Sequence, residues 1–338
     1  MRKIPLSAPP RRLFLAGIAA LVGLGVVASS VDAKTRLRIA GQHASDHNAT
    51  LVLKQLKEDI EAADVGLRVQ LFPSGQLGTG EQVFGDVRKG AIDIAHTFIY
   101  SINDPLLEIN SIPYLVENYD QMRRVFTPGS NFYAVYSELL AKQDIKLLGI
   151  FGEGFIGVGS SKRPNDPGGV GDKGLTIRVW SASVAKETAS DIGFNTTTID
   201  WGDVFPALQQ GVVDGVIGGT PEANYTSFKD AIKYFVPYNA FVENTAYYMS
   251  QKSWDKLTEQ QQQVVAELFG KAALASFDQS QATDEAFMAK LAEAGIEVIA
   301  LSDEERKTIA DHVRATTWPK LEAAFGKELL DQLKADAQ

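Results

Sequence analysis

The chain has 338 residues, of which 45% are hydrophobic and 22% are charged, and this composition excludes a disordered or collagen-like chain. It contains no cysteine, which excludes disulfide bonds, cysteine-ligated zinc and thiol catalysis. Lys and Arg number 33 against 42 Asp and Glu, and the net charge of −9 argues against binding to nucleic acid or to anionic membrane surfaces.

Residues 1–33 have the pattern of a cleaved export signal. Four basic residues and no acidic one precede a 16-residue apolar run at 13–28, and the residues up to Ala33 suit cleavage after that position. A membrane anchor is the alternative, but a bilayer span needs about 20 apolar residues. Arg11 and Arg12, followed by apolar residues, resemble a twin-arginine signal, although paired arginines also occur in ordinary export signals. The sequence therefore predicts an exported protein.

The rest of the chain is long enough for two α/β units at about 150 residues per domain. Periodicity and turn residues predict, in the first unit, a strand at 37–40, a polar loop at 41–48, a helix at 49–62, a strand at 66–72, a helix at 80–89 ended by Gly90, and a strand at 91–95. The second unit repeats this order with a strand at 175–180, a helix at 182–192, a strand at 195–199, a helix at 201–210 and a strand at 215–218. Such alternation predicts a mostly parallel sheet flanked by helices in each unit.

Two segments are expected to connect the units. Five glycines within residues 147–159 predict an extended crossing in which glycine absorbs backbone rotation, and residues 239–250 are expected to cross back. A long helix at 258–293 and helices at 302–333, begun by a capping box of Ser302 and Glu305, are predicted to pack across both units. The expected division is residues 34–152 plus about 246–257 for the first lobe, 153–245 for the second and 258–338 for the helices.

Two short motifs of enzymes fail on their context. Residues 152–157 read G-x-G-x-x-G, but a dinucleotide site needs a helix directly afterwards, and the prolines and glycines of residues 158–171 exclude one. Ser183 and Lys186 match the S-x-x-K of penicillin-binding enzymes, yet the companion S-D-N and K-T-G motifs are absent from the sequence. The sequence offers no acid–base set, nucleophile or cofactor loop, so it predicts a binding protein without a cofactor rather than an enzyme.

His43 and His47 are four residues apart, a spacing that suits metal ligands on a helix. A catalytic zinc site usually takes three protein ligands, and the segment that holds these histidines is predicted to be a loop. We therefore expect no metal site and interpret the segment as a polar loop that faces a cleft.

Arg178 is the charged residue that is hardest to explain structurally. It alternates with the apolar residues Leu175, Ile177 and Val179, and shares the opposite face of its strand with Trp180 near the strand's carboxyl end. Ligands of open α/β sheets bind at that end, and a guanidinium there favours a bidentate anionic partner. An ion pair within the same lobe is the alternative, and position alone does not decide between them.

Several motifs in order resemble those of the solute-binding subunits of TRAP (tripartite ATP-independent periplasmic) transporters, the dicarboxylate-binding-protein family. They are LFPSGQLG at 71–78, GAID at 90–93, IPYL at 112–115, the segment from KRP at 162–164 to GLTIRV at 174–179, WGDVF at 201–205, ALQQGVVDG at 207–215 and WDKL at 254–257. The resemblance covers essentially the whole chain after residue 33. It implies a two-lobed periplasmic clamp, with a long helix spanning the lobes, that closes around a small organic anion and delivers it to membrane permease subunits.

The resemblance also implies ligand-binding residues. Arg178 matches the arginine that binds the ligand carboxylate, Ser181 follows it as a polar contact, and Trp201 matches an aromatic residue of the cleft. The loops of the first lobe that line the same cleft contain Gln42, His43, His96, Thr97 and Phe98, and Trp180 lies beside Arg178.

The chain departs from the family pattern at two places. Many members have a second arginine where this chain has Phe155 and Ile156, and many have D-G-x-E-N-P where this chain reads DGVIGGTP at 214–221. Glu153, Thr220 and Glu222 are close enough in sequence to replace the missing contacts. We therefore expect a monocarboxylate with hydroxyl, keto or aromatic groups.

Other roles fit the same sequence. A ligand-presenting subunit of a sensor would use the same clamp, and an exported α/β enzyme is the less favoured alternative. The helical tail is compatible with a monomer or a homodimer, and no nucleic-acid partner is expected.

Overall fold

The computed structural model describes residues 34–101 and 104–338. The predicted export signal lies outside the described residues. No helix of the described part is long and apolar enough to cross a membrane. Residues 34–338 form one compact unit, which contains two β-sheets.

The first sheet has five strands in the order β2–β1–β3–β10–β4. Their bounds are β1 Thr35–Gly41, β2 Leu67–Phe72, β3 Ile94–Thr97, β4 Ile145–Phe155 and β10 Val242–Ser250. Strand β1 is parallel to β2 and β3, whereas β10 is antiparallel to both β3 and β4. The sheet is thus mixed, because β10 returns from the second lobe and enters between two strands of the first.

The second sheet has six strands in the order β11–β9–β5–β8–β6–β7. Their bounds are β5 Val158–Ser160, β6 Thr176–Val179, β7 Asn195–Thr198, β8 Gly215–Ile217, β9 Tyr234–Val236 and β11 Glu297–Val298. Strand β6 is parallel to β7 and β8, and β5 is antiparallel to β8 and β9. Each predicted strand of this unit is present, and the two-lobed α/β fold is confirmed with mixed rather than mostly parallel sheets.

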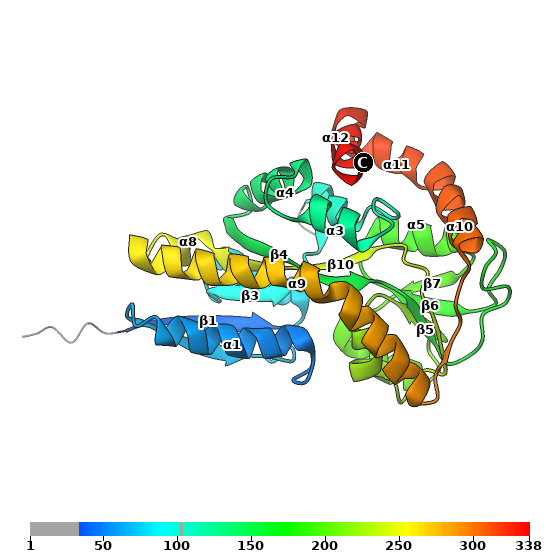
Figure 1. The fold of residues 1–338 in the computed structure, drawn as a ribbon, viewed down its shortest axis with the longest axis horizontal. Helices are drawn as coiled ribbons and strands as arrows, with labels where there is room; N and C mark the ends of the chain where they lie inside the picture. Colours follow the sequence, from blue (N-terminus) through cyan, green and yellow to red (C-terminus); the bar gives the residue numbers. More distant parts are fainter. Residues whose placement is uncertain (1–33, 102–103) are drawn as a thin grey trace, which may run out of the picture. The chain divides into compact units, whose positions relative to one another are not determined.

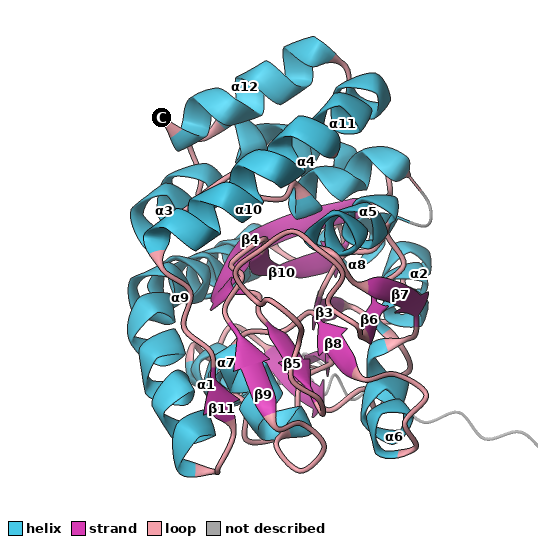
Figure 2. Cartoon of the chain, turned by 90° about the vertical axis from the view of Figure 1, so that its right-hand side faces the viewer, coloured by secondary structure: helices cyan, strands magenta, loops and turns pink. Residues whose placement is uncertain are grey.

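Helices cover both sheets (Figure 2). The helices that follow the first strands are α1 Asn48–Ala62, α2 Gly80–Lys89, η2 Pro105–Ser111, α3 Tyr119–Phe126 and α4 Asn131–Ala141. Those of the second lobe are α5 Ser183–Ile192, η3 Trp201–Asp203, α6 Val204–Gln209, α7 Pro221–Ala223 and η4 Asn224–Phe228. The remaining helices are α8 Gln251–Trp254, α9 Glu259–Glu293, α10 Asp303–Thr316, α11 Trp318–Phe325 and α12 Lys327–Ala337.

Local signals in the sequence set the ends of several helices. Helix α2 starts at a capping box of Thr79 and Gln82 and stops at Gly90, which adopts the left-handed conformation with φ 82°. The predicted capping box of Ser302 and Glu305 begins α10. These ends agree with the prediction because each depends on residues adjacent in the sequence.

The 35-residue helix α9 extends across both lobes, as predicted (Figure 1). It packs on α1 and β4 of the first sheet's layer and on α7 and β11 of the second. Apolar side chains on both faces of the first sheet form separate clusters, one beneath α1 and α9 and one beneath α2, α3 and α4. Two further clusters hold the second sheet against α5 and α10 on one face and against α6 on the other.

The glycine-rich segment has a packing role that was not predicted. Strand β4 continues to Phe155, paired with Val242 of β10, so the crossing is confined to the residues between Phe155 and β5. A Cβ atom on Gly149 would lie 2.6 Å from Ala273 Cβ, and one on Gly152 would lie 2.3 Å from the Phe277 ring. Both neighbours belong to α9. Gly149 and Gly152 therefore allow α9 to approach the strand closely, and the hinge role expected of this segment stays a prediction.

Candidate ligand-binding site

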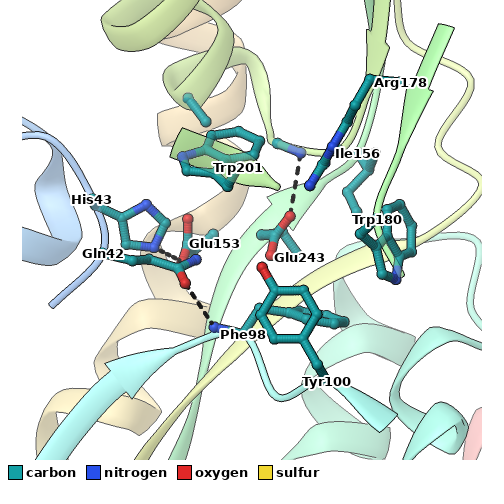
Figure 3. Close-up of a pocket in the computed structure, with 13 residues that line it drawn as sticks. Gln42, His43, Phe98, Tyr100, Glu153, Ile156, Arg178, Trp180, Trp201 and Glu243 are labelled. Carbon is teal, nitrogen blue, oxygen red and sulfur yellow. Dashed lines mark hydrogen bonds and ion pairs between the residues drawn. The ribbon is translucent and has the colours of Figure 1, made fainter. Parts of the chain in front are cut away.

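A cavity lies where the two sheets face each other, at the carboxyl ends of β1, β3, β6 and β8 (Figure 3). The residues that line it are Gln42, His43, Phe98, Tyr100, Glu153, Ile156, Arg178, Trp180, Trp201, Gly218, Gly219, Ala223 and Glu243. It encloses about 430 Å³ including the part open to solvent. A volume of this order suits a small organic molecule.

Arg178 extends from β6 of the second sheet into this cavity. Its side chain is 2% exposed, its Nε donates to the carbonyl oxygen of Ile199 at 2.7 Å, and no carboxylate of the described residues lies within 4.0 Å of it. Burial lowers the pKa of Arg178, and the nearby Tyr100 and Glu243 oppose that effect. A buried guanidinium is costly without an anionic partner, so the cavity is suited to an anion.

Two consecutive glycines make room for Arg178 and for the aromatic residue beside it. Gly218 and Gly219 have positive φ values of 119° and 87°. A Cβ atom on Gly218 would lie 3.0 Å from Arg178 Nη1, and a Cβ atom on Gly219 would lie 3.0 Å from the Trp201 ring. Any larger residue would collide with the site and strain the backbone. The departure from the family motif at this position therefore shapes the cavity directly.

Aromatic rings form much of the cavity wall. The Trp201 ring lies 5.5 Å from the Arg178 guanidinium carbon and packs edge-on against Phe228. On the other side, Phe98 packs edge-on against Tyr100 and Trp180. Such rings stack on planar or apolar parts of a ligand and stabilise positive charge through their faces.

The first lobe contributes carboxylates to the same cavity. Glu153 on β4 forms an ion pair with His43, whose Nε2 lies 3.0 Å from Glu153 Oε1. Burial opposes both charges, but their mutual attraction raises the pKa of His43 and lowers the pKa of Glu153 to about 2. Glu243 on β10 accepts a hydrogen bond from the Gly219 backbone N–H at 3.2 Å. Burial, followed by the charge of Glu153, raises the pKa of Glu243 to about 7.

His43, His47 and Glu153 are also close enough for a metal site, with one ligand atom from each within 4.8 Å of the others. His47 does not suit this role. Its Nδ1 accepts a hydrogen bond from the Ala49 backbone N–H at 3.2 Å and caps α1, so the proton of the neutral ring is on Nε2. A metal bound at Nε2 would require that proton to leave. Metal-bound histidines usually donate a hydrogen bond from their other ring nitrogen, whereas Nδ1 of His47 accepts one. We therefore interpret His43, His47 and Glu153 as a buried cluster of an acid and two histidines rather than as a metal site.

The structure brings seven of the predicted site residues together at the cavity. They are Gln42, His43, Phe98, Glu153, Arg178, Trp180 and Trp201. Two others, His96 and Thr97, are buried behind the wall, where His96 Nε2 pairs with Thr245 Oγ1 and Thr97 Oγ1 pairs with Tyr248. Both belong to β3, which continues through Thr97, further than predicted, so their side chains lie on opposite faces of the first sheet and do not line the cavity.

The other three predicted residues do not line the cavity. One caps a helix, and two form contacts between the lobes. Thr220 caps α7. Glu222 accepts from the Asn48 backbone N–H at 2.8 Å, which links α7 of the second lobe to α1 of the first. Ser181 bonds to Glu81 of α2. These two contacts connect the lobes, and Glu108 of η2 adds a third by accepting from the Ser183 backbone N–H at 3.1 Å.

The prediction omitted Tyr100, Glu243 and the glycine pair. Glu243 did leave a signal, since it is the only charged residue between 240 and 250 in a strand that is otherwise apolar or neutral. Tyr100 follows Phe98 by two residues and lies on the same side of the loop. Ile156, identified as a departure from the family arginine, lines the cavity as an apolar residue.

Two lobes joined by crossing strands, with a charged and aromatic cavity between them, define a solute-binding clamp. The chain belongs to the bacterial extracellular solute-binding proteins of family 7, whose model matches residues 39–321. It is 28% identical over 339 aligned positions to the ectoine/5-hydroxyectoine-binding periplasmic protein UehA of Ruegeria pomeroyi, with 96% of each chain covered. It is 26% identical to the sialic acid-binding periplasmic protein SiaP of Vibrio cholerae, covering 70% of this chain and 74% of that protein.

Solved structures confirm the fold. The sugar acid binding protein DctPAm of Advenella mimigardefordensis, in complex with galactonate, matches with a TM-score of 0.82 at 21% identity, covering 90% of this chain and 97% of that one. The architecture predicted from the sequence is therefore confirmed, and the family consists of solute-binding proteins rather than enzymes.

Proposed function

We propose that this protein captures a small organic carboxylate between its lobes, with Arg178 binding the carboxylate, and delivers it to the membrane subunits of a TRAP transporter. The observation that carries this proposal is the Arg178 guanidinium, buried in the cavity between the lobes with no carboxylate of the described chain within 4.0 Å. An arginine without an internal counter-ion forms the strongest pair with a planar anion from outside.

Closure of the lobes accompanies binding in this proposal. Glu222, Glu108 and Ser181 hold the lobes together through the contacts described above, and a ligand enters when these contacts open. A ligand that touches both lobes adds to those contacts and shifts the equilibrium toward the closed form. The closed form is then the state that a membrane partner can distinguish from the empty protein.

Relatives and the predicted export signal support the rest of the proposal. One relative is named as periplasmic and binds ectoine or 5-hydroxyectoine, another binds sialic acid, and the solved structure of similar fold holds galactonate. Residues 1–33, with the pattern of an export signal, agree with action outside the cytoplasm. The ligand is accordingly a small polar metabolite rather than a polymer.

The test is calorimetry and thermal shift against a panel of organic acids with the Arg178→Gln variant. Truncating one side of a desolvated charge pair costs about 2–5 kcal/mol, so the variant should bind roughly 30- to 4,000-fold more weakly. Arg163→Gln is the matched control, because Arg163 is half-exposed and pairs with Glu297 away from the cavity. Equal affinity of the wild type and Arg178→Gln, with both folded, would contradict the proposal.

A further inference from the structure

The cavity holds charges of both signs. The second sheet supplies Arg178 from β6, and the first sheet supplies Glu153 from β4 and Glu243 from β10. Figure 3 shows Glu243 in the middle of the cavity, between Arg178 and Tyr100. A site that served an anion alone would not need carboxylates facing its arginine, since like charges repel in a poorly solvated site.

The charge of Glu153 is balanced by a histidine within the protein, whereas the charge of Glu243 has no such partner among the described residues. Glu153 has His43 at 3.0 Å and also accepts from Thr245 Oγ1 at 2.6 Å. Glu243 is 9% exposed and accepts through Oε2 from Gly219. Among residues 34–101 and 104–338, no lysine, arginine or histidine nitrogen comes within 4.0 Å of the Glu243 carboxylate. Its burial raises its pKa to about 7, as expected of an acid without a counter-ion.

We propose that the ligand is zwitterionic: its carboxylate binds Arg178 and a positively charged nitrogen of the same molecule binds Glu243. This inference rests on the proposed function and names its substrate class. The two charges of the ligand then meet side chains of different sheets, Arg178 of the second and Glu243 of the first. A simple carboxylate would neutralise Arg178 and still leave Glu243 buried without a partner.

The aromatic wall supports a cationic group at this position. Tyr100 lies beside Glu243, and Phe98 packs against Tyr100 with ring centroids 5.2 Å apart. A carboxylate among aromatic rings is a combination that binds substituted ammonium or amidinium groups, because such cations carry apolar surface and little tightly held water. Ile156 adds an apolar wall. A compact molecule with a delocalised or alkylated cation is therefore expected.

A metal ion could also compensate these acids, but the geometry favours an organic cation. The His47 ring presents a protonated Nε2, as described above, and its nearest carboxylate oxygens lie at 3.6 Å in Glu153 and 3.9 Å in Glu222. No histidine nitrogen of the described residues lies within 4.0 Å of Glu243. The unpaired acid thus stands alone among aromatic rings, without the set of ligands that a divalent ion requires.

The test compares pairs of probes that have the same shape and differ in one charge. The pairs are glycine betaine with 3,3-dimethylbutanoate, pipecolate with cyclohexanecarboxylate, and N-methylnicotinate with 3-methylbenzoate. Calorimetry and thermal shift at about pH 8, where Glu243 is ionised, should show binding of at least one zwitterion and at least tenfold weaker binding of its carbon analogue. Each measurement is repeated with a chelator, so that binding through a trace metal is recognised.

The Glu243→Gln variant connects the result to this carboxylate. Glutamine keeps an oxygen that accepts from the Gly219 N–H but removes the charge, so zwitterion affinity should fall at least tenfold. Glu61→Gln is the matched control, because Glu61 also accepts from a backbone N–H, that of Val69, and does not line the cavity. It should leave the affinity unchanged.

Every other outcome overturns the inference. If the carbon analogues bind as well as the zwitterions, or bind better in Glu243→Gln, then Glu243 only competes for Arg178 or donates a proton to a neutral group. Binding that the chelator abolishes assigns the positive charge to a metal. If only nitrogen-free carboxylates bind and Arg178→Gln abolishes that binding, the proposed function stands and this inference fails. If no carboxylate of either kind binds, both fail.

Discussion

Removal of Glu222 tests whether closure of the lobes contributes to affinity. Glu222 lies on α7 of the second lobe, is 4% exposed, and accepts from the Asn48 backbone N–H at the start of α1 in the first lobe. The Glu222→Ala variant removes this acceptor and leaves the partly buried N–H without it whenever the lobes are closed. Such a loss costs about 1–3 kcal/mol, which corresponds to roughly 5- to 150-fold.

The loss falls on the closed state alone, because water satisfies the N–H when the lobes are apart. For a protein that is mainly open without ligand, the whole cost is seen as weaker binding, mostly through faster dissociation. Calorimetry gives the affinity, stopped-flow fluorescence of the cavity tryptophans gives the dissociation rate, and small-angle scattering gives the radius of gyration with and without ligand.

Glu61→Ala serves as the control for this experiment. The Glu61 carboxylate also accepts from a backbone N–H, at 2.9 Å from Val69, but both residues belong to the first lobe. This control should lower stability slightly and leave ligand affinity unchanged. If the Glu222→Ala protein bound its ligand with the affinity and the dissociation rate of the wild type, the reasoning would be refuted, because the contact between Glu222 and Asn48 would then contribute nothing to closure.

Two further predictions concern the packing of α9. Gly152→Ala should lower the free energy of unfolding by about 1–3 kcal/mol or more, because its Cβ would lie 2.3 Å from the Phe277 ring; an unchanged urea midpoint would contradict the proposed reason for this glycine. Asp284, buried on α9, accepts from Tyr119 and from the Phe155 N–H, and burial raises its pKa to about 7. The folded state therefore binds this proton more tightly than the unfolded state, and the contribution to stability grows as pH falls through 7 toward 4. The wild type should accordingly gain stability relative to Asp284→Asn between pH 8 and 5 in urea titrations, and a difference independent of pH would refute the shift.

The sequence predicted elements whose determinants are local. Helix α2 was predicted with its observed ends, because Thr79 and Gly90 carry its start and stop signals within the helix's own neighbourhood. Strands β6, β7 and β8 and the helices between them were predicted in order for the same reason, whereas β5, β9 and β11 were not predicted. Arg178 and Trp201 were found at the cavity through motifs that span the family.

Features that depend on packing between distant segments were not predictable in this way. The packing of α9 on Gly149 and Gly152 was not predicted, because glycine spacing does not reveal that Ala273 and Phe277 occupy the space above them. Glu243 was omitted because its position opposite Arg178 follows from the return of β10 into the first sheet, about 65 residues after Arg178 in the chain. Glu222 was expected at the ligand, yet its carboxylate reaches α1 instead.

Native mass spectrometry of the protein purified without denaturation tests the central claim most directly. The account predicts one small organic acid per chain in the wild-type protein, released on denaturation and identified by its mass, and none in Arg178→Gln prepared in the same way. An equal load of the same molecule in both proteins, or a bound molecule without a carboxylate, would contradict the assignment of this cavity as a carboxylate site.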